Sequence, residues 1–163
     1  MTKLIATFFY VGLLKPAPGT WGSLAALPVA YALYMLGGVP LFLIATVAVF
    51  VLGWWATAKE TEGKDDKDPS EIVIDEVAGQ WIALAPALIG AAHAGADVLA
   101  LWPGWITAFL AFRLFDIWKP GPVGWADRRG GPMGVMLDDV IAGVFAGIVV
   151  VIGAGISHGV LGL

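Results

Sequence analysis

Two pairs of adjacent acidic residues mark positions where this chain could do chemistry. Asp75-Glu76 precedes the apolar sequence VAG, and Asp138-Asp139 precedes VIAG. A single acid at a helix N-terminus is explained as a cap that the helix dipole favours. Capping does not explain two adjacent acids at a membrane boundary, because desolvation and mutual repulsion both oppose their charge. We therefore predict that each pair begins an apolar helix and belongs to a binding site.

A second set of polar residues, Arg113, Asp116 and Lys119, has the spacing i, i+3, i+6. On a helix, Arg113 can neighbour Asp116, and Asp116 can neighbour Lys119. One interpretation is a pair of structural ion pairs at the end of a helix. The other is a phosphate site, because arginine offers a planar fork of donors and lysine a point charge.

The acidic residues also suggest which metal the site would take. The chain has no Cys, so thiolate ligands and cysteine nucleophiles are excluded. Carboxylate oxygens without thiolates suit Mg²⁺ or Mn²⁺ better than Zn²⁺. We predict a Mg²⁺ site, for one or two ions, whose ligands are Asp75, Glu76, Asp116, Asp138 and Asp139.

Two further segments border these residues. The run Glu60, Glu62, Asp65, Asp66 and Asp68 is interleaved with lysines, and we interpret it as a solvated loop. The segment from Pro16 to Ser23 is a rigid turn that leads into an apolar stretch. In it, Thr20 or Ser23 is expected to cap the following helix, and the free N–H groups there could also receive an anion.

The overall composition indicates a membrane protein that forms one domain over residues 1–163. Hydrophobic residues make up 59% of the chain and charged residues 13%, against about 25% charged in soluble domains. Twelve of the thirteen acids lie in residues 60–76 and 116–139, and residues 16–58 carry no charged side chain. We expect no nucleic-acid partner, and a lipid bilayer as the surroundings.

The apolar stretches predict an all-α, polytopic fold with about five transmembrane or re-entrant helices. We place them near 22–36, 41–58, 77–92, 98–115 and 140–157, with breaks at Gly37–Pro40 and His93–Asp97. Residues 4–14 are too short to span and are predicted to form an N-terminal interfacial helix. All nine Lys and Arg then fall on one side, which the positive-inside rule places in the cytoplasm.

The fifth predicted span contains two motifs of small residues. Gly143 and Gly147 form one, and Gly155 and Gly159 form the other. Small residues at this spacing let helices approach closely in lipid. We interpret them as packing within the chain and keep a homodimer as an alternative.

Three blocks of sequence resemble the bacterial phosphatidylglycerophosphatase A family. They are APGTWGSL, EIVIDEVAGQW and FRLFDIWKPGPVGWADRRGGPMGVMLDDVIAG, in the family's order. The resemblance implies a Mg²⁺-dependent enzyme of the bacterial inner membrane that converts phosphatidylglycerophosphate to phosphatidylglycerol and phosphate. The positions to which it points are Thr20, Asp75, Glu76, Arg113, Asp116, Lys119, Asp127, Asp138 and Asp139.

Together, the residues and the resemblance give each position an expected role. We expect Glu76, Asp116, Asp138 and Asp139 to be catalytic, and Thr20, Arg113 and Lys119 to bind the phosphate. Further candidates are Ser23, Asp127 and Arg128. The hypothesis is attack by a metal-activated water with a carboxylate as general base, and an aspartyl-phosphate on Asp116 or Asp138 is the alternative.

Two functions of other classes compete with the phosphatase. A small ion- or proton-coupled transporter would also use membrane carboxylates, but it needs them near the bilayer midplane, on a path between the two sides. A scaffold subunit would use the acids only as helix caps. Placing the acids at span ends on one side favours the phosphatase.

Overall fold

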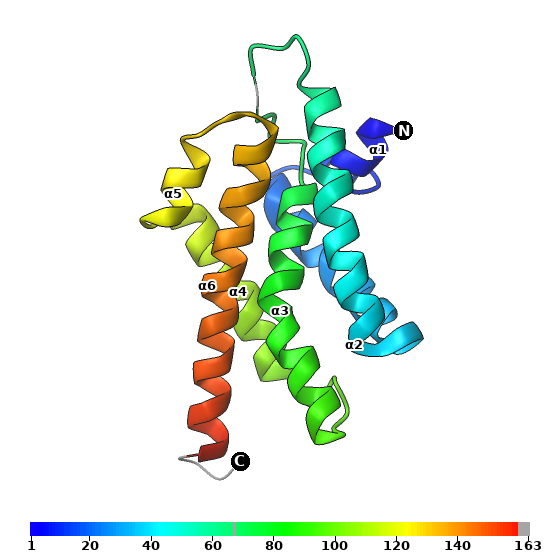
Figure 1. The fold of residues 1–163 in the computed structure, drawn as a ribbon, viewed down its shortest axis with the longest axis vertical. Helices are drawn as coiled ribbons and strands as arrows, with labels where there is room; N and C mark the ends of the chain where they lie inside the picture. The colour runs from blue at the N-terminus through cyan, green and yellow to red at the C-terminus, as the bar shows by residue number, and fades with distance from the viewer. Residues whose placement is uncertain (67, 160–163) are drawn as a thin grey trace.

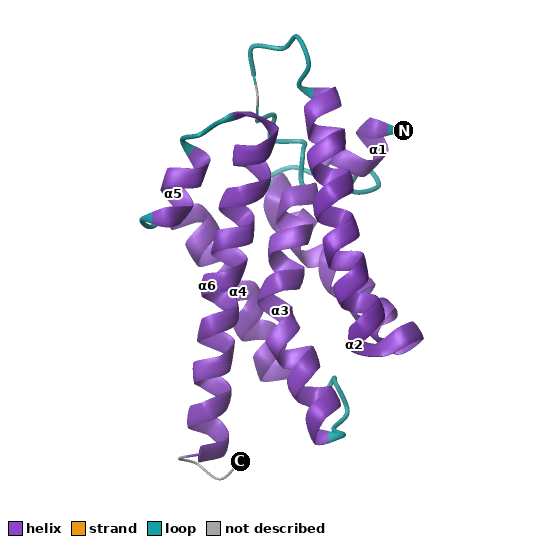
Figure 2. Ribbon diagram, viewed as in Figure 1, coloured by secondary structure: helices purple, strands orange, loops and turns teal. Residues whose placement is uncertain are grey.

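The computed structural model describes residues 1–66 and 68–159 of the chain, and this part contains helices and loops but no strand (Figures 1 and 2). The all-α prediction is therefore confirmed. The elements in chain order are α1 (Thr2–Ala6), a 3₁₀ turn η1 (Val11–Leu13), α2 (Pro18–Glu60), α3 (Ile74–Ala94), α4 (Trp102–Trp118), α5 (Pro122–Asp127) and α6 (Gly131–Gly159).

Helix α2 is a hairpin of two helices joined at Gly37 and Gly38. Gly38 has φ +62° and ψ −159°, a conformation open to glycine, and Gly37 is also outside the helical region. The chain reverses there, so the blue and cyan halves of α2 run in opposite directions (Figure 1). The predicted break is confirmed, and the first two predicted segments correspond to the halves of α2.

Among the described residues, three helices are long and apolar enough to cross a membrane: α2, α3, and α6 as far as Ser157. Helix α4 has 17 residues and starts at Trp102, four residues after the predicted Val98. Residues 98–101 form turns instead, and Pro103 occupies the first turn of the helix, where its missing N–H costs nothing.

The start of α6 corrects the prediction for the second acidic pair. We expected Asp138-Asp139 to begin a helix, but α6 begins at Gly131 and the pair lies two turns inside it. The earlier start buries Val135 and Met136 in the core. The first pair behaves as predicted, because Asp75 and Glu76 lie in the first turn of α3.

The N-terminal segment is not the single helix expected for residues 4–14. Helix α1 ends at Ala6, and Phe8, Phe9 and Tyr10 all have positive φ before η1 begins. The hydroxyl of Thr7 stops the helix, because it donates to the carbonyl of Lys3 and accepts from the Tyr10 N–H.

Close contact between α3 and α6 sets the position of the acidic residues. A Cβ on Gly143 would lie 2.4 Å from the carbonyl oxygen of Gly79, and one on Gly79 would lie 2.6 Å from that of Asp139. Only glycine allows the two backbones to approach so closely. The Gly143–Gly147 motif thus packs within the chain, whereas Gly155 has no described atom within 4 Å of where its Cβ would be.

Candidate active site

A cavity of about 220 Å³ opens at the end of the bundle where the charged residues gather. Its walls come from the start of α2, the loop before α3, the first turn of α3, the end of α4 and the second turn of α6. The residues that line it are Pro18, Gly19, Asp68, Ser70, Ile72, Asp75, Glu76, Arg113, Asp116, Lys119, Asp138 and Asp139. All five predicted metal ligands are therefore brought together, with both predicted phosphate-binding cations.

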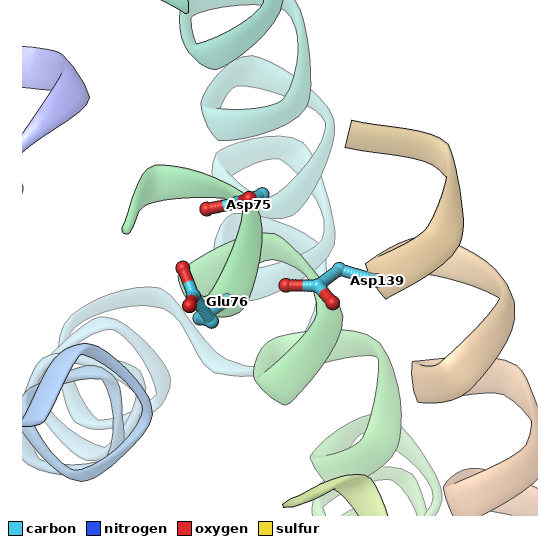
Figure 3. Close-up of side chains that lie close together, drawn as sticks. All are labelled: Asp75, Glu76 and Asp139. Atoms are coloured by element: carbon cyan, nitrogen blue, oxygen red, sulfur yellow. The ribbon is translucent and has the colours of Figure 1, made fainter. Parts of the chain in front are cut away.

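The five acids form two carboxylate groups that share Asp139. Asp75, Glu76 and Asp139 make the first group, and Asp116, Asp138 and Asp139 make the second. In each group, one oxygen from every residue lies within 4.8 Å of the others. Figure 3 shows the first group, with two side chains from α3 facing one from α6.

Several buried oxygens in this cavity have no hydrogen-bond partner. They are Asp75 Oδ1, Glu76 Oε2 and Asp139 Oδ2. Asp75 is 7% exposed and Asp139 is 2% exposed, so bulk solvent has little access to either side chain. Buried unpaired carboxylates are costly, and a bound divalent cation would offset that cost. The donor set is hard oxygen throughout, so these residues fit Mg²⁺.

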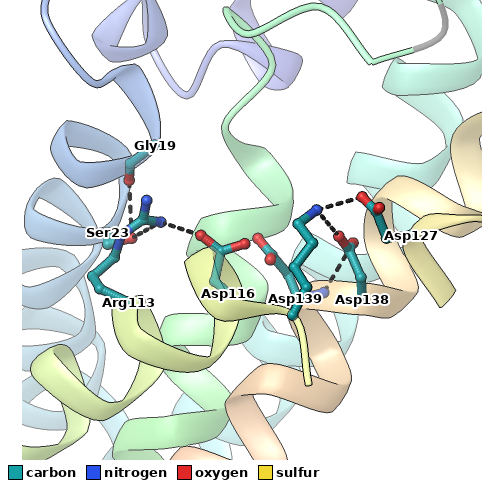
Figure 4. A network of polar contacts seen from close by, with 8 residues as sticks. Gly19, Ser23, Arg113, Asp116, Asp127, Asp138 and Asp139 are labelled. Carbon is teal, nitrogen blue, oxygen red and sulfur yellow. Dashed lines mark hydrogen bonds and ion pairs between the residues drawn. The ribbon is translucent and has the colours of Figure 1, made fainter. Parts of the chain in front are cut away.

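Arg113 is held in place from two sides (Figure 4). Its Nη1 donates to Asp116 Oδ2 at 2.9 Å and to Ser23 Oγ at 3.4 Å, and the Ser23 hydroxyl donates to the Gly19 carbonyl at 2.9 Å. The Arg113 Nε–H is buried and has no acceptor. The guanidinium therefore has an unused donor beside the cavity.

Lys119 lies just beyond α4 in a left-handed conformation, with φ +49°. Among the described residues, its amine forms no ion pair with the predicted partner Asp116. It donates instead to Asp127 and, at 2.8 Å, to Asp138. Partial burial opposes the charge, but these two hydrogen bonds outweigh it and raise the pKa of Lys119 above its ordinary value. The amine is thus a permanent cation at neutral pH.

Four of the predicted residues, Thr20, Ser23, Asp127 and Arg128, do not line the cavity, although Asp127 pairs with Lys119 at its edge. Thr20 is half-buried in the first turn of α2, and Arg128 is exposed at the end of α5. The expected capping role of Thr20 or Ser23 is wrong, because the N-cap of α2 is Ala17 and no side chain caps it. Ser23 lies one turn inside the helix, where its hydroxyl accepts a hydrogen bond from Arg113.

Some residues of the site carried no recognised signal. Asp68 and Ser70 line the cavity, whereas the sequence predicts that the acidic run ending at Asp68 is a solvated loop. Gly19 lies against Glu76, since a Cβ there would be 2.1 Å from Glu76 Oε1. Gln80, one turn after Glu76, is fully buried, and neither atom of its amide has a partner. Its place inside the EIVIDEVAGQW block is the one signal that could have singled it out.

The cavity lies at one end of the bundle rather than along it. The loop between α3 and α4 is at the opposite end (Figure 1), where Asp97 is exposed. A transporter would need carboxylates on a path through the bundle. The arrangement instead suits an anion held by Arg113 and Lys119 next to a cation held by carboxylates.

Comparisons with known proteins point to one family. A family model described as "Phosphatidylglycerophosphatase A" matches residues 4–154. The chain is 41% identical over 150 residues to a protein of that name from Haemophilus influenzae, covering 90% of this chain and 85% of the relative. It is 36% identical to one of the same name from Escherichia coli, covering 92% and 82%.

A third relative carries a different name. A protein from Bacteroides thetaiotaomicron named "Putative phosphatidylinositol-3-phosphatase" is 39% identical, with 91% of both chains covered. No solved structure matches the chain.

Proposed function

The chain belongs to the phosphatidylglycerophosphatase A family, and from this premise we propose that it hydrolyses the terminal phosphomonoester of phosphatidylglycerophosphate. The products are phosphatidylglycerol and inorganic phosphate. The observation that carries the proposal is the cavity itself, where five carboxylates of α3, α4 and α6 surround the same space as Arg113 and Lys119. Metal ions and fixed cations both stabilise the charge on the oxygens of a phosphoryl group during its transfer.

Mg²⁺ is the proposed cofactor, with Asp75, Glu76, Asp116, Asp138 and Asp139 as its ligands. The support is the set of buried carboxylate oxygens that lack a partner, together with the absence of softer ligands from the cavity lining. A bound Mg²⁺ would neutralise phosphate charge and supply Lewis acidity.

Arg113 and Lys119 are proposed to bind the phosphoryl oxygens. The free Nε–H of Arg113 gives it a donor beyond those used by Asp116 and Ser23. Lys119 is fixed between Asp127 and Asp138, which gives these two acids a positioning role. Thr20 does not reach the cavity lining, so the phosphate role rests on the two cations.

Proton transfer in the reaction is assigned to the carboxylates without a cationic partner. Glu76 and Asp139 form no ion pair in the described part of the chain, so whichever of their oxygens is not used to hold the metal could accept a proton from an attacking water. Asp116 and Asp138 are the candidates for the alternative covalent route. In a single turnover, transfer of ¹⁸O from labelled protein into phosphate would eliminate direct attack by water.

The membrane setting is part of the proposal. We place the protein in the bacterial inner membrane with the cavity on the cytoplasmic side, because the Lys and Arg residues gather at that end. The chain has no Cys, so single cysteines can be introduced at Lys64 and Ala96, which are exposed at opposite ends. An impermeant maleimide should label position 96 from the periplasm and position 64 only after lysis; the reverse pattern would overturn the orientation.

The activity is tested with purified protein and phosphatidylglycerophosphate, in Mg²⁺ or with a chelator. We expect phosphate release in Mg²⁺ that the chelator abolishes. Phosphatidylinositol 3-phosphate is offered in parallel, because one relative is named for that lipid. Release from this lipid alone would replace the proposed substrate, and release from neither would reject the phosphatase.

A further inference from the structure

The two carboxylate groups that share Asp139 differ in how their charge is balanced. In the second group, Asp116 pairs with Arg113 at 2.9 Å and Asp138 pairs with Lys119 at 2.8 Å. In the first group, no ion pair forms to Asp75, Glu76 or Asp139 anywhere in the described residues. Two of the three carboxylates in the second group therefore have an ion-pair partner among the described residues, and none of those in the first group has one.

The first group also has more buried oxygens without a partner. Each of its three residues has a buried oxygen without a hydrogen-bond partner, and these residues point toward one another from α3 and α6 (Figure 3). The backbone of Gly19 lies against Glu76 and covers it from the α2 side. Unpartnered carboxylate oxygens so close together in a buried site are costly, and a cation bound between them would offset that cost.

The second group faces a different situation. Arg113 and Lys119 stand beside its carboxylates and would repel a cation arriving alone. A phosphate bound by the same two side chains reverses this, because it adds negative charge and oxygen ligands. Mg²⁺ commonly completes its coordination with phosphate oxygens of the substrate.

We propose that the site holds two divalent cations of unequal affinity, bridged by Asp139, an inference that rests on the proposed function. The first cation is resident on Asp75, Glu76 and Asp139 before any lipid binds. The second binds to Asp116, Asp138 and Asp139 together with the substrate phosphate. A carboxylate shared between two ions is a common means of holding them side by side at phosphoryl-transfer sites.

Mn²⁺ binding measured by electron paramagnetic resonance tests this in metal-stripped full-length protein. We expect one Mn²⁺ per chain to bind without added anion, and a second to bind at least tenfold more weakly. Inorganic phosphate should strengthen the second step by at least tenfold, and the doubly loaded protein should show spin coupling between the ions. One ion per chain with no coupling, with or without phosphate, would overturn the proposal.

Variants assign the steps to the two groups. Glu76→Gln should remove the tight step, Asp116→Asn should weaken the second step and leave the tight one, and Glu62→Gln on the exposed loop should change neither. Equal loss of both steps in Glu76→Gln and Asp116→Asn would mean a single shared site. Because the wild-type stoichiometry needs no variant, misfolding of one variant does not leave the question open.

The same preparation separates this inference from the proposed function. Two unequal, coupled Mn²⁺ ions without phosphate release from phosphatidylglycerophosphate would refute the function and keep the binuclear site. Phosphate release by a protein that binds only one ion would support the proposed function and refute the binuclear site.

Discussion

In the apolar body of the bundle, buried polar side chains bond to nearby carbonyls, whereas at the charged end several buried polar atoms have no partner. Thr46 donates to the Phe42 carbonyl at 2.8 Å, and the Trp81 indole donates to the Ala26 carbonyl at 2.8 Å. The unpartnered atoms belong to Asp75, Glu76, Arg113 and Asp139 around the cavity, and to Thr57 and Gln80. The same helices thus use polar groups for stability in one region and keep them available for binding in the other.

The sharpest way to break this comparison is to remove one charge at each end. Asp116→Asn should lower phosphatase activity by about 10³-fold, because it removes a proposed metal ligand and the partner of Arg113. Asp97→Asn, at the opposite end and exposed, should leave activity within twofold. Initial rates on phosphatidylglycerophosphate check both, and equal activity in the two variants would place the site elsewhere.

A second test keeps the positive charge at position 113 and changes only the geometry of the hydrogen-bond donors. Arg113→Lys should lower activity by about 10²-fold, since the compact ammonium of lysine lacks the planar fork of separate nitrogens that lets Arg113 hold Asp116 and Ser23 and still reach a phosphate. The matched control is Arg128→Lys, on an exposed residue outside the cavity. If Arg113→Lys retained full activity, Arg113 would serve only as a positive charge.

A third test uses the close contact between Gly79 of α3 and Gly143 of α6, which connects the apolar body of the bundle to the site. Gly143→Leu should destabilise the protein by roughly 1–3 kcal/mol and also reduce activity, because it forces α6 away from α3 and separates Asp139 from Asp75 and Glu76. Gly155→Leu on the same helix meets no described atom and should do neither. Thermal unfolding in detergent and initial rates measure the two effects, and a similar loss at Gly155 would contradict the account.

The smallest effect is expected from a substitution in the apolar body of the bundle, away from the cavity. Trp81→Phe removes the hydrogen bond to Ala26 and should cost about 1 kcal/mol of stability. Activity at a temperature where the protein is folded should be unchanged. Trp102→Phe, on an exposed residue, should change neither quantity. A selective loss of activity in Trp81→Phe would mean that the body and the site are not separable.

Much of the fold could be read from local sequence. The long uncharged stretches and the glycine break at residues 37–38 predicted the helices and the α2 hairpin, because these features depend on apolar length and backbone freedom. The residues at which helices begin were harder to predict from local sequence. Pro132 in the first turn of α6 is a local signal for a start near Gly131, but it stands in a polar segment, and burial of Val135 and Met136 is what joins this turn to the apolar helix.

The sequence alone determined which residue types this protein concentrates at one end, and hence that a cation and an anion could meet there. Tertiary structure decided which of them meet. Lys119 pairs with Asp127 and Asp138 rather than with Asp116, and Asp139 joins two carboxylate groups. The reason is physical: composition and spacing act along one helix, whereas convergence depends on how closely α3 and α6 can approach, which Gly79 and Gly143 set.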